Sequence, residues 1–219
     1  MSTRVAEHKQ VVRRRKIDQL SKIDKFAQRR AQLANSALRT LAELGYARTS
    51  LREIAQNSEF SHGVLHYYFR DKVDLITYCV RQYKAAIVTR YDQVLATSAT
   101  PDELRQRFIG GMTLSLRRDT DMHRLWYDLR DQSMFEESFR DDVREIDHCI
   151  ERMIGRIVSL YAERLGLRLA ASSRLVYALV DGVFQHALLG HLAGDERAAA
   201  NLPVDLGAIL DRFVISRSA

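Results

Sequence analysis

At residues 37–76 the chain reads ALRTLAELGYARTSLREIAQNSEFSHGVLHYYFRDKVDLI, and this stretch decides the fold. Apolar residues recur at three- and four-residue steps over 26–44, which predicts a helix. Gly45 follows the last of them and is typical of a residue that ends a helix. With only two prolines and ten glycines in 219 residues, the chain has little turn punctuation, so we expect long helices throughout.

Two further helix starts follow Gly45. Thr49 or Ser50 is suited to cap a short second helix, and Glu53 completes a capping-box pattern with Ser50. Residues 57–60 predict a tight turn, after which Ser61 caps a third, very short helix. The pattern therefore predicts two short helices joined by a turn.

The third helix has one apolar side. Leu65 and Phe69 are four residues apart, so we expect both to face inward. A short helix that is held by its partner and exposed on the other side meets the requirement for entering a major groove of DNA. Residues 50–69 are therefore predicted to form a helix-turn-helix motif.

The opposite side of the third helix carries polar groups. His62 and His66 are four residues apart, as are Gly63 and Tyr67, so all four are expected to face outward. The three polar side chains offer hydrogen-bond donors and acceptors to base edges. Gly63 adds a point without a side chain, where the helix can approach DNA closely.

Hydroxyl and ammonium groups flank this face. Ser61 and Lys72 are suited to phosphate contacts that fix the register of the helix on DNA. Thr49 and Ser50 combine hydroxyls with the free N–H groups of a helix start, which also favours phosphate.

The charge is unevenly distributed. Residues 1–90 have a net charge of +10, residues 91–219 have −4, and every lysine lies in the first 84 residues. A basic front indicates contact with a polyanion. The basic arm around 13–16 has a second interpretation as a solvated tail, but 17–90 without it still holds 12 basic against 7 acidic residues.

Other features argue for a reducing compartment and against a membrane. Cys79 and Cys149 have no paired spacing, so no disulfide is expected. The start of the chain is polar and basic, unlike a signal peptide, and the apolar stretch 175–192 carries Asp181 and two histidines. We expect a soluble, cytoplasmic protein associated with the nucleoid.

Beyond the motif the chain predicts a long fourth helix over 72–96 and then further helices. The sequence TSATP at 97–101 is the clearest break and the expected boundary region between domains. The later helices are predicted over 102–117, 122–134, 136–165, 172–192 and 203–215. The fold class is all-α, with a helix-turn-helix domain joined by the fourth helix to a helical ligand-binding and dimerisation domain.

The stretch at 37–76 resembles the TetR family of regulators. The shared landmarks are Gly45-Tyr46, Thr49-Ser50, Ile54-Ala55, Ser61-x-Gly63 and Tyr68-Phe69-x-x-Lys72-x-x-Leu75. The resemblance implies that the third helix enters the major groove and that the DNA contacts come from Thr49, Ser50, Ser61, His62, Gly63, Val64, His66, Tyr67 and Lys72.

One position departs from the family pattern. The family usually has tyrosine where this chain has His66, and histidine has a shorter reach and a charge that depends on pH. Of the aromatic run that follows, Tyr68 and Phe69 are expected in the core, and Tyr46 behind the turn. The chain is divided into a basic arm (1–25), a DNA-binding domain (26–90) and a regulatory and dimerisation domain (91–219).

Small residues follow one ridge of the stretch 174–194, which resembles the penultimate helix of many TetR proteins. The ridge consists of Ala178, Gly182, His186 and Gly190, spaced four apart. Such a ridge lets two helices pack closely, as in pairing across a two-fold axis, although a core helix within one chain is the alternative. A dimer is also expected because one short recognition helix buries little surface on DNA.

The remaining helices are expected to enclose a ligand pocket. Its candidate lining is Phe108, Met112, Trp126, Tyr127, Arg130, Met134, Tyr177, Asp181 and Phe184, each of which is alternatively an ordinary core residue. Arg130 and Asp181 are charges within apolar stretches, so they either pair with each other or anchor a polar ligand group.

Enzyme motifs are not found. The chain has no HExxH, GxSxG, Walker loop or GxGxxG sequence, and His186 and His191 are five apart, a poor spacing for a metal pair. No cofactor or metal is therefore expected. The sequence predicts a homodimeric repressor that binds a palindromic operator and is released by a small-molecule inducer, with an activator, or an architectural DNA-binding protein, as the alternatives.

Overall fold

The computed structural model describes residues 24–38, 40–41, 45 and 49–216. Most of the predicted arm (1–25) and Tyr46 lie outside these residues. Two compact units are present, and the chain passes from the first to the second within one helix, between Cys79 and Val80.

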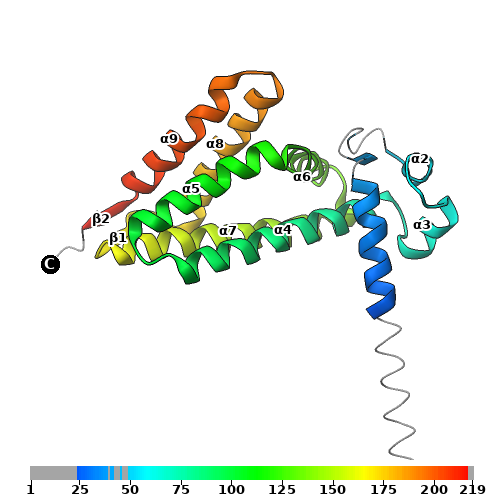
Figure 1. Ribbon diagram of the computed structural model, residues 1–219, viewed down its shortest axis with the longest axis horizontal. Coiled ribbons are helices and arrows are strands. Elements are labelled where there is room, and N and C mark those ends of the chain that lie inside the picture. The colour runs from blue at the N-terminus through cyan, green and yellow to red at the C-terminus, as the bar shows by residue number, and fades with distance from the viewer. Residues whose placement is uncertain (1–23, 39, 42–44, 46–48, 217–219) are drawn as a thin grey trace, which may run out of the picture. The chain divides into compact units, whose positions relative to one another are not determined.

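The first unit contains the predicted helix-turn-helix. A first helix, described at 24–38 and 40–41, precedes α2 (Leu51–Gln56) and α3 (His62–Tyr68), and α4 (Lys72–Thr97) begins in this unit (Figure 1). Its core is apolar and comes from all four helices; the fully buried side chains include Leu33, Ala37, Leu41, Ile54, Leu65, Leu75 and Ile76. The short helices are held by this shared core, because isolated helices of this length are marginal in water.

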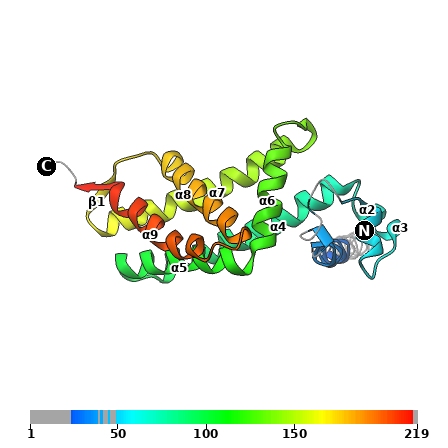
Figure 2. The ribbon, with the colours of Figure 1, turned by 90° about the horizontal axis from the view of Figure 1, so that it is seen from above.

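The second unit is a helical bundle. After α4 it contains α5 (Pro101–Arg118), α6 (Thr120–Gln132), a 3-10 turn (Glu137–Phe139), α7 (Arg140–Arg164), β1 (Leu167–Leu169), α8 (Ser173–Leu192), α9 (Glu196–Arg212) and β2 (Val214–Ser216). Viewed from above, α8 and α9 run side by side, and α8 also packs against α7 (Figure 2). The all-α fold class is confirmed.

The prediction for the last helix was wrong. It starts at Glu196 after an Asp195 cap, and Pro203 lies inside it instead of opening it. The predicted end is wrong too, because Val214–Ser216 forms β2, which pairs antiparallel with β1 so that Leu167 lies opposite Ser216. Three-residue strands are too short to leave a periodic signal, and their pairing joins residues almost fifty positions apart.

The break at 97–101 does not separate the two units. Thr100 caps α5 and Pro101 occupies its first turn, so this segment is a turn between two helices of the second unit. The chain instead divides inside α4, about ten residues before the predicted boundary at 90 and 91. A boundary within a continuous helix has no turn signal, so composition alone could not locate it.

One of the described helices, α8, is long and apolar enough to cross a membrane by length and composition. It packs against α7 and α9, and the side chains of Val180, Phe184 and Leu188 are buried there. Core helices of soluble proteins can have the same length and composition.

Candidate DNA-binding surface and buried cavity

Side-chain caps define both short helices of the motif. Ser50 Oγ accepts from the backbone N–H of Glu53 at 3.2 Å, and the Glu53 carboxylate accepts from the N–H of Ser50 at 2.7 Å. Ser61 Oγ accepts from the N–H of Val64 at 3.3 Å. The predicted capping box is confirmed, and it fixes where α2 begins.

The two sides of α3 differ as the spacing predicted. Leu65 is fully buried, whereas His62, Gly63 and His66 are exposed and Tyr67 is 73% exposed. The Nε2 atoms of His62 and His66 lie 3.1 Å apart. A Cβ added at Gly63 would meet no atom within 4 Å, so the helix has an open point there. The outward geometry is present, and contact with DNA remains a prediction.

Aromatic rings brace α3 against the first helix. The Phe26 ring lies 4.7 Å from Tyr68 and 6.0 Å from Tyr67, and the two tyrosine rings are 5.0 Å apart. Phe69 is buried as expected, but Tyr68 is only half-buried, so its predicted place in the core is wrong. Tyr68 instead supports Tyr67 from the side, which orients the exposed ring.

The flanking residues differ in accessibility. Ser50 and Ser61 are exposed, and Val64 and Lys72 are half-buried. Thr49 is only 3% exposed, so its hydroxyl does not lie on the surface. A DNA contact at Thr49 would have to come from its backbone.

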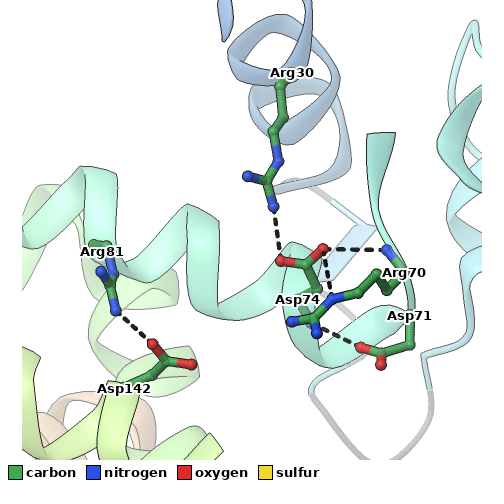
Figure 3. A network of polar contacts seen from close by, with 6 residues as sticks. All are labelled: Arg30, Arg70, Asp71, Asp74, Arg81 and Asp142. Carbon is green, nitrogen blue, oxygen red and sulfur yellow. Dashed lines mark hydrogen bonds and ion pairs between the residues drawn. The ribbon is translucent and has the colours of Figure 1, made fainter. Parts of the chain in front are cut away.

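An ion-pair network joins the start of α4 to the first helix (Figure 3). Asp74 Oδ1 lies 2.7 Å from Arg30 Nη2, and Asp74 Oδ2 accepts from the backbone N–H of Arg70 at 3.1 Å. The Arg30 guanidinium also lies over the rings of Phe69 and Tyr78, 4.8 and 4.5 Å from their centroids. This network holds the end of α3, and the sequence did not reveal it because Arg30 and Asp74 are 44 residues apart.

A second ion pair lies on α4 in the other unit (Figure 3). Arg81 Nη2 is 2.5 Å from Asp142 Oδ1 and 3.0 Å from Glu145 Oε2, so it joins α4 to α7. Ion pairs therefore hold α4 at its first turn, through Asp74, and before its middle, through Arg81, each within its own unit.

A cavity lies among α4, α5, α6, α7 and α8 of the second unit, with about 580 Å³ of empty space including its opening. Its lining consists of Lys84, Ile87, Arg90, Tyr91, Met112, Ser115, His123, Trp126, Tyr127, Ile150, Met153, Ile154, Tyr177, Val180, Asp181 and Phe184. Most of these side chains are aromatic or aliphatic, as in sites for small organic molecules.

Six of the nine predicted pocket residues line this cavity: Met112, Trp126, Tyr127, Tyr177, Asp181 and Phe184. The other three do not. Phe108 is fully buried against Tyr91, and Met134 is 67% exposed. Arg130 pairs with Asp181 and is not itself part of the lining. These three assignments are corrected, because helical periodicity alone does not say which neighbour an apolar face meets.

Arg130 and Asp181 pair with each other, which was one of the two alternatives. The guanidinium donates to Asp181 Oδ2 at 2.6 Å, and the Tyr127 hydroxyl donates to Oδ1 at 2.9 Å. Next to them the Tyr177 hydroxyl donates to Asp147 Oδ1 at 2.5 Å. The carboxylates beside the cavity are therefore engaged by other side chains.

A buried histidine was missed by the sequence. His123 Nε2 lies 2.8 Å from Ser115 Oγ and 3.2 Å from the Tyr83 hydroxyl, and its ring contacts Phe184. Burial, with the nearby Lys84 charge, lowers the pKa of His123 to about 2. The imidazole is thus neutral and acts as a hydrogen-bonding part of the cavity wall.

Lys84 was also missed, because a single lysine in a long helix is usually solvated. It is only 7% exposed, and its Nζ lies 5.2 Å from the centroid of the Trp126 ring. Burial lowers the pKa of Lys84 to about 7. The cavity therefore contains an amino group, partly protonated near neutral pH, in an aromatic surrounding.

Three members of the predicted small-residue ridge lie on the surface of α8. Ala178, Gly182 and His186 are exposed, and a Cβ at Gly182 would meet no atom within 4 Å. Gly190 differs, since a Cβ there would clash with Ala198 of α9 in the same chain. Its predicted place in a dimer interface is corrected: the lack of a side chain lets α8 and α9 pack closely.

Comparison with known proteins agrees with this architecture. Residues 33–79 match the family model for bacterial regulatory proteins of the tetR family. The HTH-type transcriptional regulator BetI of Burkholderia thailandensis is 28% identical over 185 residues, which covers 81% of this chain and 90% of that protein.

Solved structures show the same fold at low identity. A putative transcriptional regulator from Saccharomonospora viridis in complex with choline superposes with a TM-score of 0.70 at 17% identity, covering 87% of this chain and all of that one. The transcriptional regulator FadR from Bacillus subtilis in complex with stearoyl-CoA gives 0.63 at 17% identity, covering 82% and 97%.

A capped helix-turn-helix followed by a helical bundle with an internal cavity defines a DNA-binding transcriptional regulator, a class of proteins that are not enzymes. The resemblance at 37–76, the family model and the relatives agree on the family within this class. The family model at residues 33–79, the BetI relatives and the solved neighbours together support a TetR family transcriptional regulator.

Proposed function

We propose that the chain is a homodimeric repressor that binds a palindromic operator and releases it when a small molecule enters the cavity. The observation that carries the proposal is that α4 contributes residues to both the DNA-binding unit and the cavity. Its first turns hold Asp74, which anchors the recognition helix region, and three turns later it lines the cavity with Lys84, Ile87 and Tyr91. A ligand that contacts α4 acts on a helix shared by both units.

The DNA side of the proposal rests on the outward face of α3. We assign base contacts to His62, His66 and Tyr67, close approach to Gly63, and phosphate contacts to Ser61. Lys72, Ser50 and the backbone at Thr49 complete the phosphate contacts. Since phosphate neutralisation releases counterions, binding should weaken steeply with salt.

The dimer is supported by the surface of α8. Leu175, Leu179 and Leu189 are exposed there beside Ala178 and Gly182, which leaves an apolar strip on a helix whose other side is buried. Apolar surface of this kind favours pairing with a second copy across a two-fold axis. A two-fold dimer presents two recognition helices and so requires a palindromic site.

Binding of a small molecule is supported by the cavity and by the neighbours, whose structures contain choline and stearoyl-CoA. The ligand is proposed to shift the population of dimers toward a spacing that no longer fits successive major grooves. An architectural DNA-binding protein would need no such cavity. We place the protein in the cytoplasm, associated with the nucleoid.

The test is selection of bound sequences from a random DNA library with the full chain, followed by a reporter under the selected site. A palindromic consensus and higher reporter output in cells lacking the protein are expected for a repressor. Lower output in those cells would instead support an activator. Enrichment of no sequence would overturn the proposed operator-binding role.

A further inference from the structure

Lys84 occupies an unusual place in the cavity. Only 7% of Lys84 is exposed, and its side chain lines the cavity from α4. The ammonium lies 5.2 Å from the Trp126 ring centroid and 5.6 Å from that of Tyr83. Across the described residues no carboxylate forms an ion pair with it and no acceptor takes a hydrogen bond from it.

The nearest carboxylates already form hydrogen bonds or ion pairs with other side chains. Asp181 is held by Arg130 and Tyr127, and Asp147 by Tyr177. Burial lowers the pKa of Lys84; Asp181, Asp147 and Asp119 oppose the shift, and Arg130 adds to it. Protonation of a buried amino group that has no ion-pair partner is costly, so an anion that enters the cavity would stabilise the ammonium form of Lys84.

Aromatic walls alone would also suit a quaternary ammonium ligand, because such cations bind over tryptophan and tyrosine faces. Here the face of Trp126 is already approached by the Lys84 ammonium. A second cation at this ring would be repelled by Lys84 in a surrounding of low dielectric. The charge of the cavity therefore favours an anion over a cation.

The rest of the lining is suited to an apolar body. Met112, Ile150, Met153, Ile154, Val180 and Phe184 surround the space. We propose that the ligand of this cavity is a small amphipathic carboxylate, whose carboxylate pairs with Lys84 and whose apolar part lies among these side chains. The inference rests on the proposed ligand response and names the chemical class of the ligand.

Trp126 is the only tryptophan of the chain, so its fluorescence reports on this cavity alone. The probes are straight-chain carboxylates of two to twelve carbons below their micelle concentrations, with the amide and the alkyltrimethylammonium ion of each chain length, and choline. Titration of the full chain should show at least one carboxylate that changes the Trp126 emission and binds at least tenfold more tightly than its amide and its ammonium counterpart.

Lys84→Met removes the charge while keeping a flexible apolar side chain, and Arg124→Met removes an exposed charge from α6 as the matched control. Carboxylate affinity should fall at least tenfold in Lys84→Met and stay unchanged in Arg124→Met. A thermal shift assay gives a second readout that does not depend on Trp126 and shows that both variants are folded.

The proposal is overturned if no carboxylate of the series binds, if an ammonium ion binds as tightly as the carboxylate of its length, or if Lys84→Met keeps the wild-type affinity. None of these measurements contains DNA. A carboxylate that binds through Lys84 without releasing the operator would refute the proposed inducer response and leave the ligand class intact. Release of the operator by a cationic ligand would support the proposed inducer response and refute the proposed ligand class.

Discussion

The Arg130 guanidinium lies 2.6 Å from the Asp181 carboxylate, and this contact joins α6 to α8 beside the cavity. Asp181 is mostly buried, and the Tyr127 hydroxyl donates to its other oxygen. The carboxylate is thus satisfied on both sides by the protein itself. It serves as a structural support of the cavity wall and forms no ion pair with Lys84.

Asp181→Asn should lower the free energy of unfolding by about 1–3 kcal/mol, because Arg130 would keep only Asp147 at 3.8 Å as a charged partner. Urea denaturation followed by circular dichroism measures the change. The matched control is Asp141→Asn, which breaks the highly exposed pair with Arg144 and should leave stability unchanged. Equal stability of both variants would show that the Arg130–Asp181 pair is not a support.

Tyr67→Ala and Lys72→Ala should each weaken operator binding by about 1–3 kcal/mol while the oligomeric state is kept. Tyr67 is largely exposed, so its loss should cost DNA contacts more than folding stability. Fluorescence anisotropy at several salt concentrations is the measurement, and Lys72→Ala should reduce the salt slope by about one. Arg124→Ala, on α6, is the control; wild-type affinity in Tyr67→Ala would refute the assignment of α3.

Gly182→Leu should disrupt the proposed dimer, because the added side chain would project from the exposed strip of α8. Gly110→Leu is the matched control, since Gly110 is likewise exposed on a helix with no atom within 4 Å of an added Cβ. Light scattering should give a monomer for the first variant and a dimer for the second. A dimer in both would place the interface away from Gly182.

Stability should rise with pH above 7, because burial lowers the pKa of Lys84 to about 7 from its ordinary 10.5. Between these values the unfolded chain binds more protons than the folded one, so the free energy of unfolding increases by up to about 1.4 kcal/mol per pH unit. Lys84→Met should be more stable than the wild type at pH 7, and this advantage should shrink by pH 9. Urea titrations of both proteins at pH 7, 8 and 9 test this, and parallel curves would contradict it.

Acid should lower the stability of the fold through His123. Burial lowers its pKa to about 2, whereas the unfolded chain takes up a proton near pH 6.5, so stability is lost as the pH falls below 6.5. His123→Gln keeps a polar group next to Ser115 without this proton uptake, so its stability should decline less between pH 7 and 5. His148→Gln, at an exposed position of α7, is the control and should follow the wild type. A decline in His123→Gln as steep as in the wild type would refute the role of this burial.

Much of the motif was predictable from local spacing. The Ser50–Glu53 box, the Ser61 cap and the inward position of Leu65 depend on residues three or four apart, and such relationships are written directly in the sequence. The end of α8 and the start of α5 followed from the same signals within two residues. The prediction of Pro203 as a helix start failed because Asp195 caps the helix earlier.

The cavity shows where local reasoning ends. Local reasoning named Trp126, Tyr127, Tyr177 and Phe184 as candidates for the pocket lining, and these do line the space. It could not tell that Met134 lies beyond the last turn of α6, where it is exposed.

By itself, then, the sequence determined the helical class of the fold, the bounds of the helix-turn-helix and the two faces of its recognition helix, because these depend on neighbours within one or two turns. Only the tertiary structure decided that Lys84 is buried beside Trp126, that Asp181 is taken by Arg130, and that Gly190 packs within the chain. Each of these joins helices far apart in the sequence, where the environment of a charge is set by the groups packed around it and not by its own neighbours in the chain.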